Sequence, residues 1–326
     1  MDTGSQLLIA LSAAESSAFQ TSLLEDFDSI TLSMSKIDAR RATACLERDQ
    51  TMIEAAVRSS PGGFEAVNGK IHECLRAWLA SEGRRALETR QATCGDDDKV
   101  TLYLMNCLAS LLSDQGKLTE AEPLYREALR RRRETLGEAH PSTLCSLNDL
   151  AGLLTKQGKL SAAEPLCREA LRGRQEVLGE THPDTLSALH NLAWLLQKLG
   201  RPSEGEPLCR EALRGFQEAL GEAHPDTLAA LNDLSTLLQK QGKLSEAEPL
   251  CREALRCFQE TLGETHPDTL SSLNHLANLL SELGKLSEAE PLYREALRGR
   301  QETLGETHPD TLAALSGLES VLEKQR

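Results

Sequence analysis

A 42-residue repeat in the last two-thirds of this chain restricts what the chain can fold into. Each copy carries the tag His-Pro-Asp-Thr-Leu, or His-Pro-Ser-Thr-Leu in one case, at the same distance from the next. The five tags begin at His140, His182, His224, His266 and His308. A fixed period of this length is typical of a solenoid, in which similar supersecondary structures stack on one another.

Apolar residues recur at helical spacing inside each repeat and predict its first helix. Leu144, Leu147, Leu150 and Leu154 lie on one face of such a helix, which is expected over residues 141–157. Gly158 follows, and a glycine just after the last apolar residue is a common helix end. The leucine face is expected to lie in the core.

A capping box predicts the start of the second helix. Ser161 precedes Glu164 by three residues, so each side chain can bind a free backbone N–H of the first turn. Pro165 is expected within that turn, where a missing N–H costs least. The helix continues to Leu178, and Gly179 is expected to end it in a left-handed conformation. The same pairing occurs in all five repeats, at Thr119/Glu122, Ser161/Glu164, Ser203/Glu206, Ser245/Glu248 and Ser287/Glu290.

Each repeat is therefore predicted to be a helical hairpin, and a single hairpin cannot bury both of its apolar faces. Five stacked hairpins and a terminal half-repeat are enough for a continuous core, which predicts an all-α solenoid over residues 99–326. The half-repeat, residues 311–326, is expected to act as a capping helix. The apolar residues expected to cover the last hairpin are Leu312, Leu315, Leu318, Val321 and Leu322.

The leucine, alanine and glycine positions between Leu147 and Ala170 resemble those of the tetratricopeptide repeat. The longer repeat, LNDLAGLLTKQGKLSAAEPLCREALRGRQEVLGETHPD, is similar to the kinesin light chain variety. The resemblance covers residues 99–326 and implies an adaptor or scaffold that holds a peptide or helix of a partner protein in a concave groove. A motor light-chain role is less well supported, because residues 1–100 lack the sustained heptads of a coiled coil.

The first hundred residues have a different pattern. Residues 7–11 and 29–34 are predicted to be strands and residues 15–27 and 48–58 helices, so residues 1–63 form a short, incomplete α/β segment. The wording DTGSQLLIALS and GGFEAVNGKI resembles the trailing part of a TIR-like domain. This resemblance implies an alternative function, in which the repeats are the sensor region of a TIR-like signalling enzyme or receptor.

Residues 64–98 are predicted to be a helix and a linker. The helix is expected over residues 64–89, with one apolar face. The three aspartates at 96–98 lack the spaced oxygen ligands of a calcium loop and are expected to be solvated ahead of the first repeat.

The composition argues against several functions. The chain has 36 basic and 50 acidic residues, a formal net charge of −14, which argues against a nucleic-acid or anionic-membrane surface. The one strongly basic run, residues 130–133, is expected to be a solvated helix end. The early apolar run at 7–11 is too short for a membrane span and follows no basic segment, so a cytoplasmic protein is predicted.

The sequence contains none of the catalytic or metal-binding motifs His-Glu-x-x-His, Cys-x-x-Cys and Gly-x-Ser-x-Gly. The tag histidines, one per hairpin, cannot converge on one metal ion and are expected to be connector residues. Cys167, Cys209 and Cys251 share one repeat position and are expected to be buried packing residues. The chain is therefore predicted to be no enzyme and to bind no cofactor or metal.

The repeats differ from one another along one face of the first helix. Residues 145, 148, 149, 152, 155 and 156, with their equivalents 42 residues apart, form what we call the variable stripe. One position holds Gly152, Trp194, Thr236 and Asn278. Because the second helix, EPLCREALR, is almost unchanged, relaxed drift of a solvated surface explains this variation less well than partner binding does.

The variable stripe therefore predicts the partner-binding groove. The family resemblance implies that its asparagines hold the ligand's backbone, and Trp194 is expected to be an anchor because tryptophan dominates binding hot spots. The predicted groove residues are Asn106, Asn148, Lys156, His190, Trp194, Lys198, Asn232, Lys240, Asn274 and Asn278.

Three groove lysines indicate the charge of the ligand. Lys156, Lys198 and Lys240 share one position, and the flanking equivalents are Asp114 and Glu282. A locally positive middle with acidic ends predicts a short acidic peptide with an aromatic or leucine anchor, bound by a monomeric protein. The alternative is that lysine is favoured there by the dipole at a helix C-terminus, and both interpretations stay open.

Overall fold

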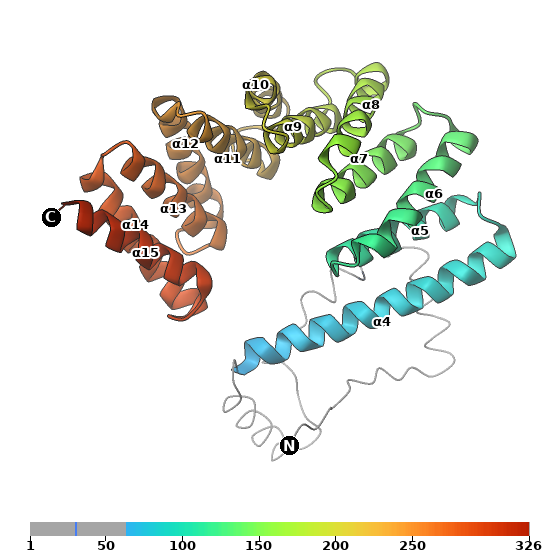
Figure 1. Ribbon diagram of the computed structural model, residues 1–326, viewed down its shortest axis with the longest axis horizontal. Coiled ribbons are helices and arrows are strands. Elements are labelled where there is room, and N and C mark those ends of the chain that lie inside the picture. The colour runs from blue at the N-terminus through green and yellow to red at the C-terminus, as the bar shows by residue number, and fades with distance from the viewer. Residues whose placement is uncertain (1–29, 31–62, 326) are drawn as a thin grey trace, which may run out of the picture. The chain divides into compact units, whose positions relative to one another are not determined.

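The computed structural model describes residue 30 and residues 63–325 (Figure 1). This part of the chain contains α-helices and no strand, and successive helices pair as hairpins, which confirms the predicted all-α solenoid. The elements predicted at 7–11, 15–27 and 48–58 lie outside the described residues. Ile30 is helical, so the strand predicted over 29–34 is wrong at that residue; a short alternation does not separate the two conformations.

The chain divides into two compact units, Met1–Gln157 and Gly158–Arg326. The N-terminal unit contains α4 (Gly63–Cys94), α5 (Lys99–Asp114), α6 (Leu118–Leu136) and α7 (Pro141–Lys156). The C-terminal unit contains α8 (Leu160–Leu178), α9 (Pro183–Lys198), α10 (Pro202–Leu220), α11 (Pro225–Lys240), α12 (Leu244–Leu262), α13 (Pro267–Glu282), α14 (Leu286–Leu304) and α15 (Pro309–Gln325). Within each unit, every helix packs against the next one along the chain.

The predicted leucine stripe forms the core of each first helix. Leu144, Leu147, Leu150 and Leu154 are at most 2% exposed, and the same positions are buried in α9, α11 and α13. Small residues allow the two helices of a hairpin to approach closely. At Gly205 of α10 an added Cβ would lie 2.8 Å from a backbone oxygen of α9, and the equivalent residues of the other repeats are buried alanines. The buried cysteines Cys167, Cys209 and Cys251 are confirmed as packing residues.

The histidine and the threonine of the tag each form a hydrogen bond near the start of the first helix. His182 is the N-cap of α9, and its Nδ1 accepts the backbone N–H of Asp184 at 3.1 Å. Pro183 follows at the first helical position, where its missing N–H costs nothing. Thr227, in the next repeat, is buried and donates its hydroxyl to the carbonyl of Gly221 at 2.8 Å. The tag therefore joins the end of one hairpin to the start of the next.

The predicted capping box is wrong. α8 begins at Leu160, its N-cap is Lys159, and no side chain bonds the free N–H groups there. Glu164 contacts Arg168 and Arg201 instead, both at 2.8 Å, because an ion pair competes with a backbone donor for the same oxygens. The same holds in the other repeats, whose second helices also lack a side-chain cap. The proline predicted in the first turn lies further inside the helix, because the helix begins earlier than the capping box implies.

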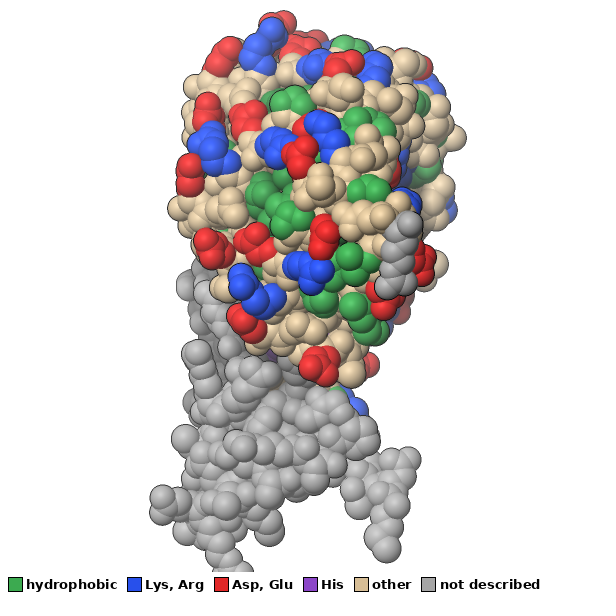
Figure 2. Space-filling model, turned by 90° about the vertical axis from the view of Figure 1, so that its left-hand side faces the viewer, with side chains coloured by type: hydrophobic (Ala, Val, Ile, Leu, Met, Phe, Trp, Pro, Cys, Tyr) green, Lys and Arg blue, Asp and Glu red, His purple; other side chains and the backbone are tan. Residues whose placement is uncertain are grey.

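The terminal helix α15 covers α14 less completely than predicted. Leu318 and Val321 are buried, at 7% and 0% exposed, but Leu312 and Leu315 are 50% and 37% exposed. In two other repeats the residue at the position of Leu312, Leu186 or Leu270, lies against the second helix of its hairpin, and α15 is followed by no second helix in the described residues. Figure 2 shows this side of the C-terminal unit, where hydrophobic side chains lie among charged ones.

Two surface predictions are also wrong. The aspartates at 96–98 are not merely solvated, because Asp98 caps α5 and Asp96 pairs with Arg131 at 2.7 Å. The basic run at 130–133 is not a solvated helix end, because Arg132 is only 7% exposed. The sequence pattern could not show the pair of Asp96 with Arg131, since these residues lie about a helical hairpin apart. No helix among residues 63–325 is both long and apolar enough to cross a membrane.

Candidate functional site

The variable stripe lies at the surface of the first helices. On α9, α11 and α13 its residues are half-buried or exposed, whereas the leucines beside them are buried. Trp194 on α9 is 37% exposed, and its equivalents Thr236 and Asn278 also reach the surface. Helical spacing places the predicted residues of this unit on one face of their helices: His190, Trp194, Lys198, Asn232, Lys240, Asn274 and Asn278.

Stripe residues on adjacent first helices contact one another. His190 Nε2 of α9 lies 2.9 Å from Asp233 Oδ2 of α11. Gln239 of α11 donates its Nε2 to Glu282 Oε1 of α13 at 2.8 Å, and its Oε1 lies 3.3 Å from His275 Nε2. Burial lowers the pKa of His275, which keeps this ring neutral at pH 7. Asp233, Gln239 and His275 therefore belong to the site, although the sequence placed them only among the variable positions.

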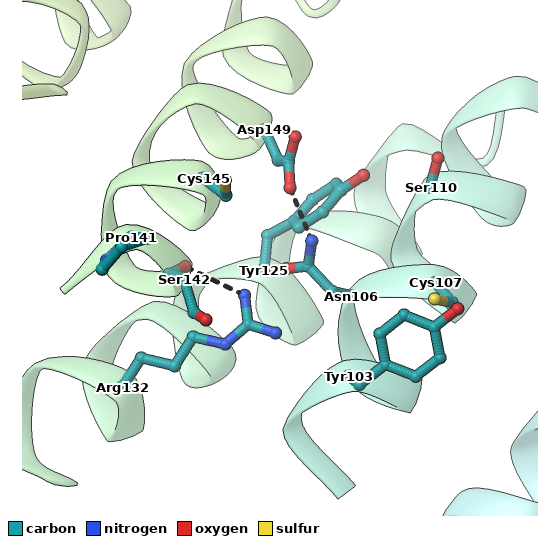
Figure 3. Close-up of a pocket in the computed structure, with 10 residues that line it drawn as sticks. All are labelled: Tyr103, Asn106, Cys107, Ser110, Tyr125, Arg132, Pro141, Ser142, Cys145 and Asp149. Carbon is teal, nitrogen blue, oxygen red and sulfur yellow. Dashed lines mark hydrogen bonds between the residues drawn. The ribbon is translucent and has the colours of Figure 1, made fainter. Parts of the chain in front are cut away.

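In the N-terminal unit the stripe lines a cavity of about 510 Å³ between α5, α6 and α7 (Figure 3). Across this cavity Asn106 donates its Nδ2 to Asp149 Oδ2. Farther along the stripe, Lys156 Nζ lies 3.2 Å from both Asp114 Oδ1 and Ser113 Oγ. This exposed ion pair contributes little to stability, but it partly balances one of the predicted groove lysines.

The groove asparagines turn their amide oxygens inward. Oδ1 is buried without a hydrogen-bond partner in Asn106, Asn232 and Asn274. Such an unmatched acceptor costs about 1–3 kcal/mol, so each oxygen would gain from a donor that reaches it. Asn148 holds the equivalent half-buried position of α7. Asn278 differs, because its Oδ1 accepts the hydroxyl of Tyr293 from α14.

The three groove lysines have different surroundings. Lys156 is the one paired with Asp114. Lys198 Nζ lies 5.1 Å from the centroid of the Trp194 ring, one turn away on α9, a cation–π contact that contributes about 0.5–1 kcal/mol when exposed. Lys240 is exposed at the end of α11. Trp194 therefore packs partly against its own helix and leaves the rest of its ring open.

The described residues do not suggest a metal site, because in residues 63–325 no three His, Cys, Asp or Glu side chains come together to hold an ion. What the variable stripe offers is a row of inward amide oxygens, an exposed indole ring and several cations. These groups can hold the backbone and side chains of a peptide.

Models of known protein families match the repeat region of this chain. A model described as the tetratricopeptide repeat matches residues 98–175, 144–204, 236–302 and 274–326, and a second model of the same description matches residues 185–226. The chain belongs to the tetratricopeptide repeat family. Repeats of this family typically form non-enzymatic scaffolds that bind other proteins, so protein partners are indicated.

Several solved structures share the tetratricopeptide fold. A protein of Podosopora anserina, described as a kinesin light chain with nearly identical TPR-like repeats, is 27% identical, with a TM-score of 0.57 over 62% of this chain and 96% of its own. BtubC from P. vanneervenii is 23% identical, with a TM-score of 0.62 over 72% and 94%. The STAND protein PH0952 from Pyrococcus horikoshii, with a tetratricopeptide repeat sensor, is 13% identical, with a TM-score of 0.63 over 95% and 44%. The last two share the fold alone. No curated protein sequence matches the chain.

The nearly unchanged second helices of the tetratricopeptide hairpins have a structural role. Glu206 of α10 contacts Arg210, four residues on, at 3.0 Å and Lys243 of the next repeat at 2.7 Å. The equivalent contacts join Glu164 to Arg168 and Arg201, and Glu248 to Arg252 and Lys285. This ladder of ion pairs gives the glutamate and arginine of EPLCREALR a structural role in every one of these hairpins. Its constancy is therefore no independent support for partner binding at the variable stripe.

One position of the second helix also belongs to the site, although the sequence did not single it out. It holds Arg132, Arg174, Phe216, Phe258 and Arg300, each at most 8% exposed. Phe216 packs edge-on against His190, with ring centroids 6.4 Å apart, and Arg132 lines the cavity of Figure 3. The signal was present as an exchange of arginine for phenylalanine in an otherwise uniform helix.

Proposed function

We propose that this protein is a cytoplasmic, monomeric adaptor whose variable stripe is the groove for a peptide or helix of a partner protein, as in kinesin light chain-like proteins. The exposed indole of Trp194 carries the proposal. Trp194 is 37% exposed and its equivalents in other repeats are glycine, threonine and asparagine, so the hairpin fold does not require the indole. Tryptophan is also the residue type most enriched in binding hot spots.

The amide oxygens support the same proposal. Asn106, Asn232 and Asn274 each keep a buried acceptor that lacks a donor. The backbone N–H groups of a bound peptide are donors of the matching kind, and pairing with them would remove the cost of the unmatched acceptor. The asparagines would then fix the backbone of the ligand while Trp194 binds a side chain.

Alanine substitutions separate the groove from the scaffold. Trp194→Ala and Asn232→Ala are each expected to weaken partner binding by about 1 kcal/mol or more while leaving the free energy of unfolding nearly unchanged. Leu192→Ala, at a core position that is 2% exposed, is the matched control on α9 and should cost about 2–5 kcal/mol of stability. Urea unfolding and calorimetric binding measure the two effects. Equal losses of stability for both sets would show that the stripe is packing surface.

The three groove lysines Lys156, Lys198 and Lys240, which we call the lysine row, extend the proposal to the charge of the ligand. Lys198 and Lys240 lie in the C-terminal unit without an acidic partner among its ion pairs, which favours an acidic peptide with an aromatic or leucine anchor. Such a peptide should bind the full chain more tightly than its lysine-substituted counterpart, and the difference should shrink at high salt. Tighter binding of the basic peptide would remove the lysine row from the site.

A further inference from the structure

The cavity between α5, α6 and α7 contains a buried positive charge. Arg132 of α6 is 7% exposed and forms the end of the cavity beside Pro141 and Ser142, with Asp149 at the other end (Figure 3). Its guanidinium donates to the carbonyls of Leu102 and Ser142, both at 3.2 Å, and to the hydroxyl of Ser146. All three acceptors are neutral.

A buried guanidinium with neutral partners is a costly arrangement, because a buried charge is stable only when an opposite charge or several strong hydrogen bonds compensate it. None of the ion pairs formed by residues 63–325 includes Arg132. The charge of Asp149, on the opposite wall, acts to raise the pKa of Arg132. Its Oδ2, however, already accepts a hydrogen bond from Asn106 Nδ2. Burial lowers the pKa of the Arg132 guanidinium, the direction expected of a buried charge whose hydrogen-bond partners are neutral.

The fold does not require this charge. Phe216 and Phe258 occupy the position of Arg132 in two other repeats and are 1% and 8% exposed, so the hairpin accepts an apolar ring there. Arg300 keeps the arginine and donates to the carbonyl of Asp310 at 2.8 Å, which shows the structural use of the position. Arg132 makes the equivalent hydrogen bond, to the carbonyl of Ser142, and also lines the cavity.

We propose that this cavity is a subsite for an acidic side chain of the bound partner peptide, with Arg132 as the group that recognises the carboxylate. The proposal rests on the peptide-binding function proposed above and names one of its contacts. A peptide meets both ends of the cavity, since its carboxylate can reach Arg132 while its backbone N–H groups reach Asp149. A phosphate group fits less well, because its second negative charge would be repelled by Asp149.

Cys145 provides a local readout of binding. This exposed thiol lines the cavity, whereas the exposed thiols of Cys74 and Cys94 lie on α4. The experiment measures the alkylation rate of each of the three cysteines by peptide mass spectrometry on the full chain. The probes are a pool of short peptides with a central Asp-Glu pair in randomised flanks and a matched pool with Asn-Gln. We expect the acidic pool to protect Cys145 at about tenfold lower concentration than the amide pool, the effect of one charge-assisted pair.

Variants of the full chain test the role of Arg132. Arg132→Phe should abolish the preference for the acidic pool, Arg132→Lys should retain part of it, and Arg300→Phe, the matched control, should leave it unchanged; melting midpoints establish that each variant folds. The proposal is overturned if both pools protect Cys145 equally, or if Arg132→Phe keeps the acidic preference. It also fails, while the proposed function stands, if the pools bind in a Trp194-dependent way and leave Cys145 unprotected. If the pools protect Cys145 but Trp194→Ala does not weaken their binding, the proposed role of Trp194 as an anchor is overturned instead.

Discussion

At the residue scale, Gly317 shows how an exchange in one helix constrains its neighbour. A Cβ added to Gly317 of α15 would lie 2.3 Å from Tyr293 Cε1 of α14. Three other repeats have cysteine at the position of Tyr293, namely Cys167, Cys209 and Cys251. In the last hairpin the tyrosine ring lies against glycine, whereas Tyr125, its equivalent in the first repeat, shares a cavity with Asp149 at the position of Gly317.

Gly317→Ala should therefore lower stability by about 1–3 kcal/mol through overpacking, which outweighs the gain in helix propensity of about 1 kcal/mol. With Tyr293→Cys in the same chain the clash is absent, so the same Gly317→Ala change should become neutral or stabilising. Urea unfolding of the four chains measures this change of sign. An equal effect of Gly317→Ala in both backgrounds would show that Tyr293 is not the obstacle.

The burial of the asparagine amide oxygens in the variable stripe also differs from one residue to the next. The sequence identified Asn106, Asn232 and Asn274 by their repeat position and by the family resemblance, but it could not show that their oxygens are buried without a partner. That depends on how far each amide turns toward the neighbouring helix, which varies between equivalent positions. Asn278, predicted on the same grounds, is instead bonded to Tyr293.

At the element scale, histidine is an uncommon way to begin a helix. The preferred caps are serine, threonine, aspartate and asparagine, whose short side chains reach the first free N–H groups. The tag histidine does the same with Nδ1 at the start of α7, α9, α11, α13 and α15. The sequence pattern described these residues as connectors because histidine is not a cap signal.

Replacing the cap of one helix tests this role. His182→Ala should lower stability by about 1 kcal/mol, whereas His182→Asn should preserve most of it, because the amide oxygen can accept the same N–H. Lys117→Ala is the matched control, since Lys117 is the N-cap of α6 and forms no side-chain cap bond. Thermal unfolding followed by circular dichroism gives the three midpoints. A loss for His182→Asn as large as for His182→Ala would mean that the ring packs rather than caps.

At the scale of the whole molecule, we predict that α15 acts as a cap of the C-terminal unit. Its Ala314, Leu318 and Val321 cover α14, while Glu319 occupies the position that is Ala193 or Ala277 in other repeats. A glutamate in place of a buried alanine makes the outer face of α15 polar, as expected of a terminal repeat.

Removing residues 311–326 should uncover the apolar face of α14, lower the melting midpoint and promote self-association. Light scattering after gel filtration measures the association. The double substitution Leu312→Ser and Leu315→Ser is the control, because both side chains are already exposed and their loss should leave the midpoint unchanged. A truncated chain that stays monomeric with an unchanged midpoint would contradict the capping role of α15.

The sequence by itself determined the architecture and the candidate surface. A 42-residue period with a leucine face has one efficient solution, a stack of hairpins, because an apolar face repeated along a chain is buried only by its equivalent in the neighbouring repeat. Comparing the repeats with one another also separated the buried positions from the variable stripe, since packing restricts the buried positions far more strongly.

Only the tertiary structure decided which side chains meet. The pairs His190 with Asp233, Glu206 with Lys243, and Asn106 with Asp149 join residues about one repeat apart. Repeat equivalence gives each member of such a pair its position in the repeat, but it does not say which side chains face each other. The charge of Arg132 is the clearest case: the sequence predicts a solvated helix end, and the packing of α6 against α5 and α7 buries the guanidinium on a cavity wall.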